Sequence, residues 1–252
     1  MVAFKAANHI IVNRINHIYF ICLRQAPLSF GEGPGVRFSG REQYVISKRT
    51  PMKPRRKPVS TPRKPAHFPD ENVAERWDAR HLIGHTEFDE FRFVGCDFSA
   101  ADFGQIRFSD CLFERCNLSS VKLAGTALQN VAFEDCKLLG LQFTACRDML
   151  FGVHFDQCQL RYASFAGRVM PHTRFVGCQL NEADFADADL SGAVFQDCTL
   201  AGAVFQKTRL AAADFTTATG FIIDPESNPM AGARFTLDGL LGVVAKYGLI
   251  VE

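Results

Sequence analysis

The sequence predicts an all-β fold in which the chain winds into a solenoid of stacked coils. An apolar residue recurs every five positions from Phe88 to Phe215. This period matches neither an α-helix, with about 3.6 residues per turn, nor the alternation of a strand. A second period is nested in the first, because the motif Phe-x-x-Cys-x-Leu returns every 20 residues. Four pentads therefore complete one coil, and residues 20 apart stack on one another.

Each pentad has a large apolar residue at its centre. One coil cannot bury these side chains by itself, whereas stacked coils bury them in continuous columns. Each buried Phe or Leu contributes about 1.5–3 kcal/mol of transfer free energy, which offsets the cost of ordering the chain. The expected central residues are Phe88, Phe93, Phe98, Phe103, Phe108, Phe113, Leu118, Leu123, Leu128, Phe133, Leu138 and Phe143, then Leu150, Phe155, Leu160, Phe165, Met170, Phe175, Leu180, Phe185, Leu190, Phe195, Leu200, Phe205, Leu210 and Phe215.

The period slips once, by two residues. The motif steps by 22 residues between Phe133 and Phe155, and its cysteine steps by the same amount, from Cys136 to Cys158. Because both columns slip together, the two extra residues form a local bulge in a continuous coil. The simplest place for this bulge is the stretch 145–151.

Eight cysteines lie in the repeat region, and six of them form one column. Side chains at this position are small because two of them share one corner of the coil. Neighbouring cysteines belong to successive coils and form no Cys-x-x-Cys pair, so a tetrahedral zinc site is not expected. Disulfides between coils are geometrically reachable, but we expect buried thiols and, with them, a cytoplasmic location. The column is Cys96, Cys116, Cys136, Cys158, Cys178 and Cys198.

Charge and composition divide the chain into segments. Residues 1–65 hold 13 Lys and Arg against 2 Asp and Glu, whereas residues 86–220 hold 11 against 17. A basic, Pro-rich stretch such as that after Met52 is typical of disordered tails, and we expect translation to begin at Met52. The expected segments are a non-native or disordered extension (1–51), a disordered basic tail (52–69), a repeat body with its N-terminal cap (70–220) and a C-terminal cap (221–252).

The N-terminal cap is expected to cover the open end of the stack with Trp77, Leu82 and Ile83, as terminal repeats must. His81 and His85 are four residues apart, a spacing that suits a metal on a helix, but no third ligand lies nearby in the sequence. His154 and His172 have no Ser or Cys partner in a catalytic motif. We therefore expect no catalytic site, no metal and no cofactor.

The repeat resembles that of the pentapeptide repeat family. The resemblance implies a right-handed, four-sided β-helix with one pentad on each side. The central residue and the small residue two positions before it then point inward, and the other three face water. The runs that carry the resemblance are Ala183-Asp184-Phe185, Ala188-Asp189-Leu190, Ala193-Val194-Phe195 and Ala213-Asp214-Phe215.

The C-terminal segment predicts a short helix that plugs the end of the stack. Thr236 is a suitable N-cap and Gly248 a suitable C-cap. Gly239 and Gly242 weaken the helix, which therefore depends on packing. Its surplus apolar surface is expected to pair with a second copy in an isologous dimer. The residues expected there are Leu237, Leu240, Leu241, Val244 and Tyr247.

This tail also resembles the Qnr-like branch of the family, and the resemblance implies a function. Members of that branch are dimeric rods of bacteria that bind DNA gyrase and topoisomerase IV, imitate DNA and counter quinolones or other gyrase poisons. The matching residues are Ile223-Asp224-Pro225, Asn228, Ala233, Phe235 and Tyr247-Gly248-Leu249-Ile250.

Outward carboxylates are numerous, and four cluster in adjacent pentads at Glu182, Asp184, Asp187 and Asp189. A negative rod about as wide as a duplex imitates DNA electrostatically; the plainer interpretation is a surface that keeps the rod soluble. The corresponding functional alternatives are a gyrase-binding DNA mimic and a structural or scaffold β-helix with another protein partner. Neither requires direct binding of nucleic acid by the body or insertion in a membrane.

Overall fold

The structure is a computed structural model that describes residues 10–15, 18–23 and 72–249. The chain forms two compact units, Met1–Lys57 and Pro58–Glu252.

In the first unit, strands β1 (Ile10–Ile15) and β2 (Ile18–Leu23) pair antiparallel as a hairpin. The remainder of the expected extension (1–51) and all of the expected basic tail (52–69) lie outside the described residues. The hairpin does not test whether residues 1–51 belong to the native product, so that expectation stays a prediction.

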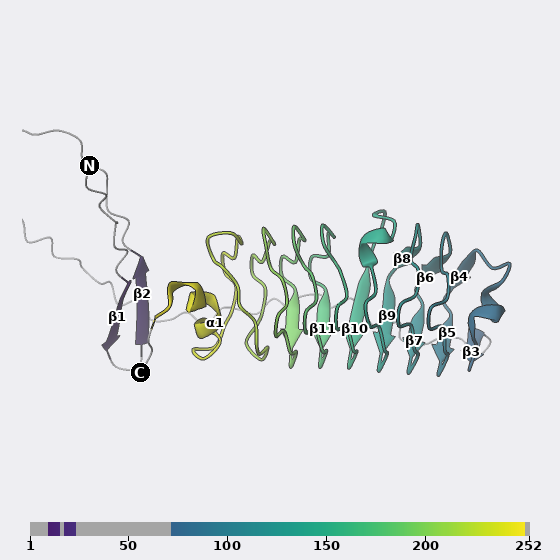
Figure 1. The fold of residues 1–252 in the computed structure, drawn as a ribbon, viewed down its shortest axis with the longest axis horizontal. Coiled ribbons are helices and arrows are strands. Elements are labelled where there is room, and N and C mark those ends of the chain that lie inside the picture. Colours follow the sequence, from purple (N-terminus) through teal and green to yellow (C-terminus); the bar gives the residue numbers. More distant parts are fainter. Residues whose placement is uncertain (1–9, 16–17, 24–71, 250–252) are drawn as a thin grey trace, which may run out of the picture. The chain divides into compact units, whose positions relative to one another are not determined.

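The second unit is the parallel β-helix that the repeat predicts (Figure 1). Bridges between residues 20 apart, such as Asp97 with Asn117 and Asp102 with Lys122, form two further sides of each coil. One wall is a seven-stranded sheet and another is three-stranded. The seven strands are β3 (Val73–Glu75), β5 (Arg92–Val94), β7 (Leu112–Glu114), β9 (Val131–Glu134), β10 (Val153–Asp156), β11 (Arg174–Val176) and β12 (Val194–Gln196). The three are β4 (Glu87–Asp89), β6 (Arg107–Ser109) and β8 (Ala127–Gln129).

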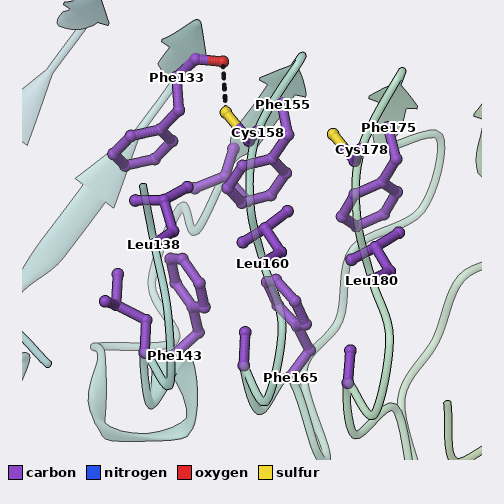
Figure 2. Close-up of a cluster of buried hydrophobic side chains, with 14 of the residues drawn as sticks. Phe133, Leu138, Phe143, Phe155, Cys158, Leu160, Phe165, Phe175, Cys178 and Leu180 are labelled. Atoms are coloured by element: carbon purple, nitrogen blue, oxygen red, sulfur yellow. Dashed lines mark hydrogen bonds between the residues drawn. The ribbon is translucent and has the colours of Figure 1, made fainter. Parts of the chain in front are cut away.

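The core consists of stacked columns of central residues (Figure 2). Along a column the rings lie face to face: Phe175 and Phe195 are 5.0 Å apart at an interplanar angle of 3°. Between columns they meet edge to face, as Phe175 and Phe185 do at 6.0 Å and 81°. Both arrangements are favourable for aromatic pairs, so the period of five both buries the rings and orients them.

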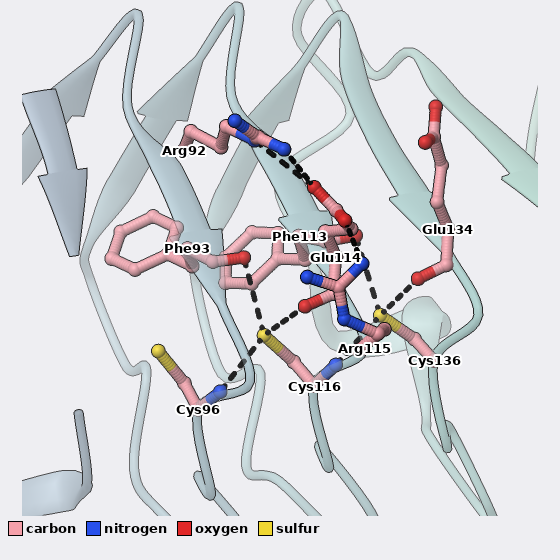
Figure 3. Close-up of polar contacts among 9 residues, drawn as sticks. All are labelled: Arg92, Phe93, Cys96, Phe113, Glu114, Arg115, Cys116, Glu134 and Cys136. Atoms are coloured by element: carbon pink, nitrogen blue, oxygen red, sulfur yellow. Dashed lines mark hydrogen bonds and ion pairs between the residues drawn. The ribbon is translucent and has the colours of Figure 1, made fainter. Parts of the chain in front are cut away.

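The small inward residues tie each coil to the one before it. The thiol of Cys116 donates to the carbonyl of Phe93 at 3.4 Å, and the hydroxyl of Thr208 donates to the carbonyl of Phe185 at 2.8 Å. Figure 3 shows this ladder at its N-terminal end. All eight described cysteines are free and buried, as predicted. Burial raises the pKa of Cys111 to about 12, which makes its thiol a poor nucleophile.

The corners of the coils contain a conformation that the periodicity alone did not predict. The residue two positions after each centre often adopts the left-handed region; Glu182 and Asp187 both have a φ of 57°. Asn, Asp and Gly tolerate this region better than other residues. This preference accounts for Gly, Asp or Asn at many of these positions, such as Gly167, Asp187 and Gly192.

The two extra residues lie in the predicted bulge, which joins the 3-10 helix η3 (Phe143–Ala145) to β10. The prediction that Leu150 is a buried centre is wrong, because its side chain is 72% exposed. The bulge carries the chain away from the wall, and Phe151 packs against the core instead, 6.4 Å from the ring of Phe143.

Stacking continues beyond residue 220, where the sequence pattern fades. The ring of Phe235 lies 5.3 Å from that of Phe215 and nearly parallel to it. The helix α1 (Leu240–Val244) and the 3-10 helix η4 (Ala245–Tyr247) follow, and Gly248 ends them with a left-handed φ of 60°, as predicted. No helix among the described residues has the length and apolar character needed to cross a membrane.

Candidate protein-binding surfaces

The four clustered carboxylates, Glu182, Asp184, Asp187 and Asp189, flank one side of a single coil and are called the acidic patch. This side is the pentad centred on Phe185, which is fully buried. Glu182 lies at the corner before it and Asp187 at the corner after it, whereas Asp184 lies on this side itself and Asp189 on the next side, both in β-bridges. The structure thus places the predicted residues on two adjacent sides of one coil and at the corners that bound the first of them.

Two members of the acidic patch hold the backbone of their turns. The carboxylate of Asp184 accepts from the amide of Ala186 at 2.9 Å. Asp189 accepts from the amide and the hydroxyl of Ser191 at 3.0 and 2.6 Å, and these hydrogen bonds lower the pKa of Asp189. Such side-chain-to-backbone bonds stabilise turns, so both residues contribute to the fold as well as to the surface charge.

The other two members, Glu182 and Asp187, project into solvent. Both residues are exposed, and within the described part of the chain neither side chain makes a hydrogen bond or an ion pair. They therefore provide uncompensated negative charge on the acidic patch. Sequence reasoning did not separate the two kinds of acid, although their positions relative to the pentad centre distinguish them.

Several acids of the rod are paired with arginine, including one member of the acidic patch, because Asp189 Oδ2 lies 3.8 Å from Arg209 Nη1. Glu114 forms ion pairs with Arg92 and Arg115 (Figure 3). Asp214 accepts from Arg234 at 2.8 Å. Pairing lowers the net field at these places, so the negative charge of the body is not evenly available to a partner.

The predicted dimerisation residues divide into outward and inward members. Leu237 and Leu241 are 61% and 50% exposed, whereas Leu240, Val244 and Tyr247 are half-buried. The residue that seats the helix on the core is Val243, which the predicted apolar face omitted; it is buried.

A close approach fixes α1 against the end of the β-helix. The amide of Ile223 donates to the carbonyl of Gly242 at 3.1 Å. A Cβ atom at Gly242 would lie 2.2 Å from the carbonyl oxygen of Phe221, so only glycine fits there. The glycine that weakens the helix intrinsically is thus the one that allows it to dock.

An ion-pair network holds η4 to the preceding turn. Lys246 Nζ lies 2.5 Å from Asp224 Oδ1 and 2.7 Å from Glu226 Oε2. The Tyr247 hydroxyl donates to Glu226 at 3.0 Å. The hydrogen bonds from Lys246 lower the pKa of both carboxyl groups.

At the opposite end, Trp77 covers the first coil together with the 3-10 helix η2 (Ala79–Leu82). His81 stacks on Trp77 with ring centroids 5.3 Å apart, and its Nδ1 lies 2.9 Å from Asp78 Oδ1. Among residues 72–249, no three His, Cys, Asp or Glu side chains are grouped so that they could hold a metal ion.

Comparison with known proteins agrees with this architecture. A model for the pentapeptide repeat region matches residues 86–165, and a model for eight pentapeptide repeats matches residues 158–197 and 178–216. No curated protein matches the chain.

Solved structures of the same architecture are similar at low sequence identity. A trypsin-treated form of QnrB1, a plasmid-mediated fluoroquinolone resistance protein, has a TM-score of 0.52 and 16% identity, covering 71% of this chain and 98% of that one. Full-length QnrB1 has a TM-score of 0.44 and 17% identity, covering 70% and 99%. HetL from the cyanobacterium Nostoc sp., a protein involved in heterocyst differentiation, has a TM-score of 0.22 and 14% identity, covering 61% and 89%. Because the family models together span residues 86–216, the chain belongs to the pentapeptide repeat family.

Proposed function

We propose that this chain is a non-catalytic bacterial protein that imitates duplex DNA, binds DNA gyrase and topoisomerase IV in the cytoplasm, and protects them from quinolones or other poisons. The observation that carries the proposal is the uncompensated charge of Glu182 and Asp187 at two corners of one coil. DNA-binding surfaces of enzymes are basic, so a negative rod competes for them. The fold shared with the fluoroquinolone resistance protein QnrB1 supports the same function.

Two copies are proposed to pair through the C-terminal helix. Leu237 and Leu241 expose large apolar side chains at the end of the β-helix, where burial against a second copy would remove them from water. An isologous contact would use the same residues on both protomers. The dimer would present an acidic patch on each side of its two-fold axis and so imitate a longer duplex.

The experiment that tests the proposal is a gyrase supercoiling assay titrated with the full chain, with and without a fluoroquinolone. We expect inhibition at high protein concentration, or rescue from the drug at lower concentration. The informative variant is Glu182→Gln with Asp187→Asn, because it removes the exposed charge without disturbing the turn hydrogen bonds of the other two acids. We expect it to weaken the effect about tenfold and to reduce its salt dependence.

A matched control is Asp89→Asn with Glu90→Gln. Glu90 is exposed and adopts the same left-handed corner conformation, with a φ of 54°, but lies near the N-terminal end. Equal losses in both pairs would mean that only net charge matters and would contradict a specific acidic patch. A correctly folded wild-type chain with no effect on gyrase would favour the alternative, a scaffold β-helix with another protein partner.

A further inference from the structure

The cysteine column is uniform over six coils, whereas the inward column on the next side of the β-helix is mixed. That neighbouring column consists of Ala101, Val121, Leu141, Ala163, Ala183 and Ala203, all of which are buried. Packing at the inward position therefore accepts Ala, Val or Leu and does not by itself require cysteine in six successive coils. The column also continues across the two-residue slip, because Lys137 pairs with Gln159 and keeps Cys136 beside Cys158.

The β-helix sets the spacing of the thiols along this column. Figure 3 shows the sulfur atoms of Cys96, Cys116 and Cys136 in a row. Successive coils stack about 4.8 Å apart, so equivalent sulfur atoms of neighbouring coils are separated by about that distance. A metal ion that binds two sulfur atoms in line, with bonds of about 2.3 Å, spans about 4.6 Å. The column cannot surround a tetrahedral ion, but its spacing matches an ion with two ligands.

The backbone stabilises a sulfur atom that has lost its proton. The amide of Trp77 donates to Cys96 Sγ at 3.3 Å, and the amide of Cys96 donates to Cys116 Sγ at 3.4 Å. The amide of Cys116 donates to Cys136 Sγ at 3.4 Å. Hydrogen bonds from the thiols of Cys116 and Cys158 lower the pKa of Cys136. Donors that point at sulfur favour the thiolate, which is the form that binds metals.

Two cysteines outside the column provide a contrast within the same fold. One coil after Cys111 the chain places Val131, and one coil after Cys146 it places Arg168. Neither cysteine therefore has a second thiol along its own column. Burial raises the pKa of both thiols to about 12. The described part of the chain thus contains stacked thiols and isolated thiols that are equally buried.

The charge of the ion decides which soft metal suits a buried pair of thiolates. Thiolates prefer soft metal ions. A singly charged ion such as Cu⁺ would leave a net negative charge in the core, which is costly, whereas a doubly charged ion gives a neutral group. Hg²⁺ is soft, doubly charged and binds two sulfur atoms in line. In the exchange two S–H bonds break, two S–Hg bonds form, and two protons pass to water with no change of oxidation state.

We propose that the cysteine column is a binding site for soft, doubly charged metal ions, each held between the thiolates of two adjacent coils. The six thiols of the column, taken in pairs, hold at most three ions. Each ion also cross-links two coils and so stabilises the stack. The inference goes beyond the proposed function and does not depend on it, because it gives the β-helix a capacity to sequester thiol-reactive metals.

The test measures how much Hg²⁺ the full chain retains, in a Cys22→Ser background that removes the cysteine of the first unit. Two variants each keep five of the eight described thiols. The broken-column variant has no two thiols in adjacent coils of the column; it carries Cys116→Ala, Cys158→Ala and Cys198→Ala. The contiguous control keeps the column intact from Cys96 to Cys178; it carries Cys111→Ala, Cys146→Ala and Cys198→Ala.

Both variants should fold, because alanine occupies the same inward position in other pentads. The thiols are buried, so the ion enters during local opening, and the protein is incubated until its metal content is constant. Elemental analysis then measures the mercury that remains as a competing monothiol is added. We expect the contiguous control to need at least about tenfold more competitor than the broken-column variant, because the second thiolate of a pair binds intramolecularly.

The thermal unfolding midpoint of the contiguous control should rise on addition of Hg²⁺, because a ligand of the folded state stabilises it. Equal retention by both variants would overturn the inference. Loss of cooperative unfolding on addition of Hg²⁺ would also overturn it, since the thiols would then bind the ion only in an unfolded chain. If the broken-column variant fails to fold, single variants decide: Cys136→Ala should lower the capacity from three ions to two, and Cys111→Ala should leave it unchanged.

Discussion

The two ends of the β-helix solve the same problem with different chemistry. At the N-terminal end, the Trp77 ring lies 6.3 Å from that of Phe88 and 6.1 Å from that of Phe93. One large aromatic side chain therefore covers the ends of the columns that these two residues begin. At the C-terminal end, the helix α1 covers the core through Val243, while Leu241 of the helix and Leu237 in the turn before it are exposed. The N-terminal end is closed by a side chain that fills the space above the core. The C-terminal end is closed by the segment around α1, which also has a second, exposed apolar face. The N-terminal cap exposes one large apolar side chain, Ile83, which was expected to cover the stack but is 79% exposed, whereas the C-terminal end exposes two, and that end is therefore the one proposed to pair with another copy.

The largest effect is expected from removing the N-terminal seal. Trp77→Ala should lower the free energy of unfolding by about 3 kcal/mol, the lower end of the range for Trp, because Trp77 is only partly buried. Urea titration measures the loss, and amide exchange should localise it to β3 and β4. Trp77→Phe, which keeps a ring, should lose less than half as much. Unchanged exchange in β3 would mean that Trp77 does not seal this end.

The next largest effect is expected from adding one methyl group where α1 packs against the end of the β-helix. Gly242→Ala gains about 1 kcal/mol of helix propensity, but its Cβ would meet the carbonyl oxygen of Phe221 at 2.2 Å. Overpacking costs about 1–3 kcal/mol, and a backbone atom cannot move aside easily, so we expect net destabilisation of about 1 kcal/mol and faster exchange in α1. Ala245→Ser, at an exposed site of η4, is the control. A more stable Gly242→Ala protein would show that propensity outweighs the contact.

Removing the outer apolar face should separate pairing from folding. Leu237→Ser with Leu241→Ser should change the free energy of unfolding of the monomer by less than about 0.5 kcal/mol, because both side chains are exposed. Sedimentation at micromolar concentration should show a dimer for the wild type and a monomer for the variant. Replacement of both by Met should preserve the dimer. An unchanged sedimentation profile would rule out this surface as the dimer contact.

The smallest effect is expected in the acid sensitivity of the packing of the C-terminal helices α1 and η4. Lys246 lowers the pKa of Asp224 and Glu226 below their ordinary values of 3.8 and 4.5. Groups with lowered folded pKa values stabilise the fold above those ordinary values, and the contribution disappears as pH falls through the folded values. Between pH 6 and pH 3, α1 should therefore lose more protection from exchange in the wild type than in Lys246→Met. Equal losses of protection in both proteins would show that the ion-pair network of Lys246 does not hold α1 in place.

The sequence was sufficient to predict the wall, because a strict period leaves one arrangement for its central residues. Phe175 and Phe195 stack 5.0 Å apart as their 20-residue spacing requires, and the cysteine column is buried. Gly248 ends the terminal helices in the expected left-handed conformation. These features depend on local pattern, which a single sequence contains.

The failures occur where the period stops. The period of five assigned Leu150 to the core, because the period alone does not show which residues of a bulge point away from the β-helix core. Arg168 was itself a visible signal, as a charged residue in a column of small ones one coil after the slip. The difference between Asp184, which caps a turn, and Asp187, which faces water, depends on position in the pentad rather than on residue type. The dimer and the partner remain proposals, since no repeat pattern specifies them.

The ladder of inter-coil hydrogen bonds gives the molecule an adjustable length. The amide of Asp214 donates to the carbonyl of Ala193 at 2.9 Å, so the residues on either side of the segment 194–213 already touch. Excising those 20 residues would let the chain rejoin in register and bring the acidic patch about 4.8 Å closer to the C-terminal end. Small-angle scattering of the deletion variant should detect a shorter particle that keeps its cross-section; an unfolded variant would refute this modularity. In-frame loss or duplication of a single 20-residue coil is therefore a direct way to change the length of the β-helix, so that it fits partners whose binding surfaces differ in length.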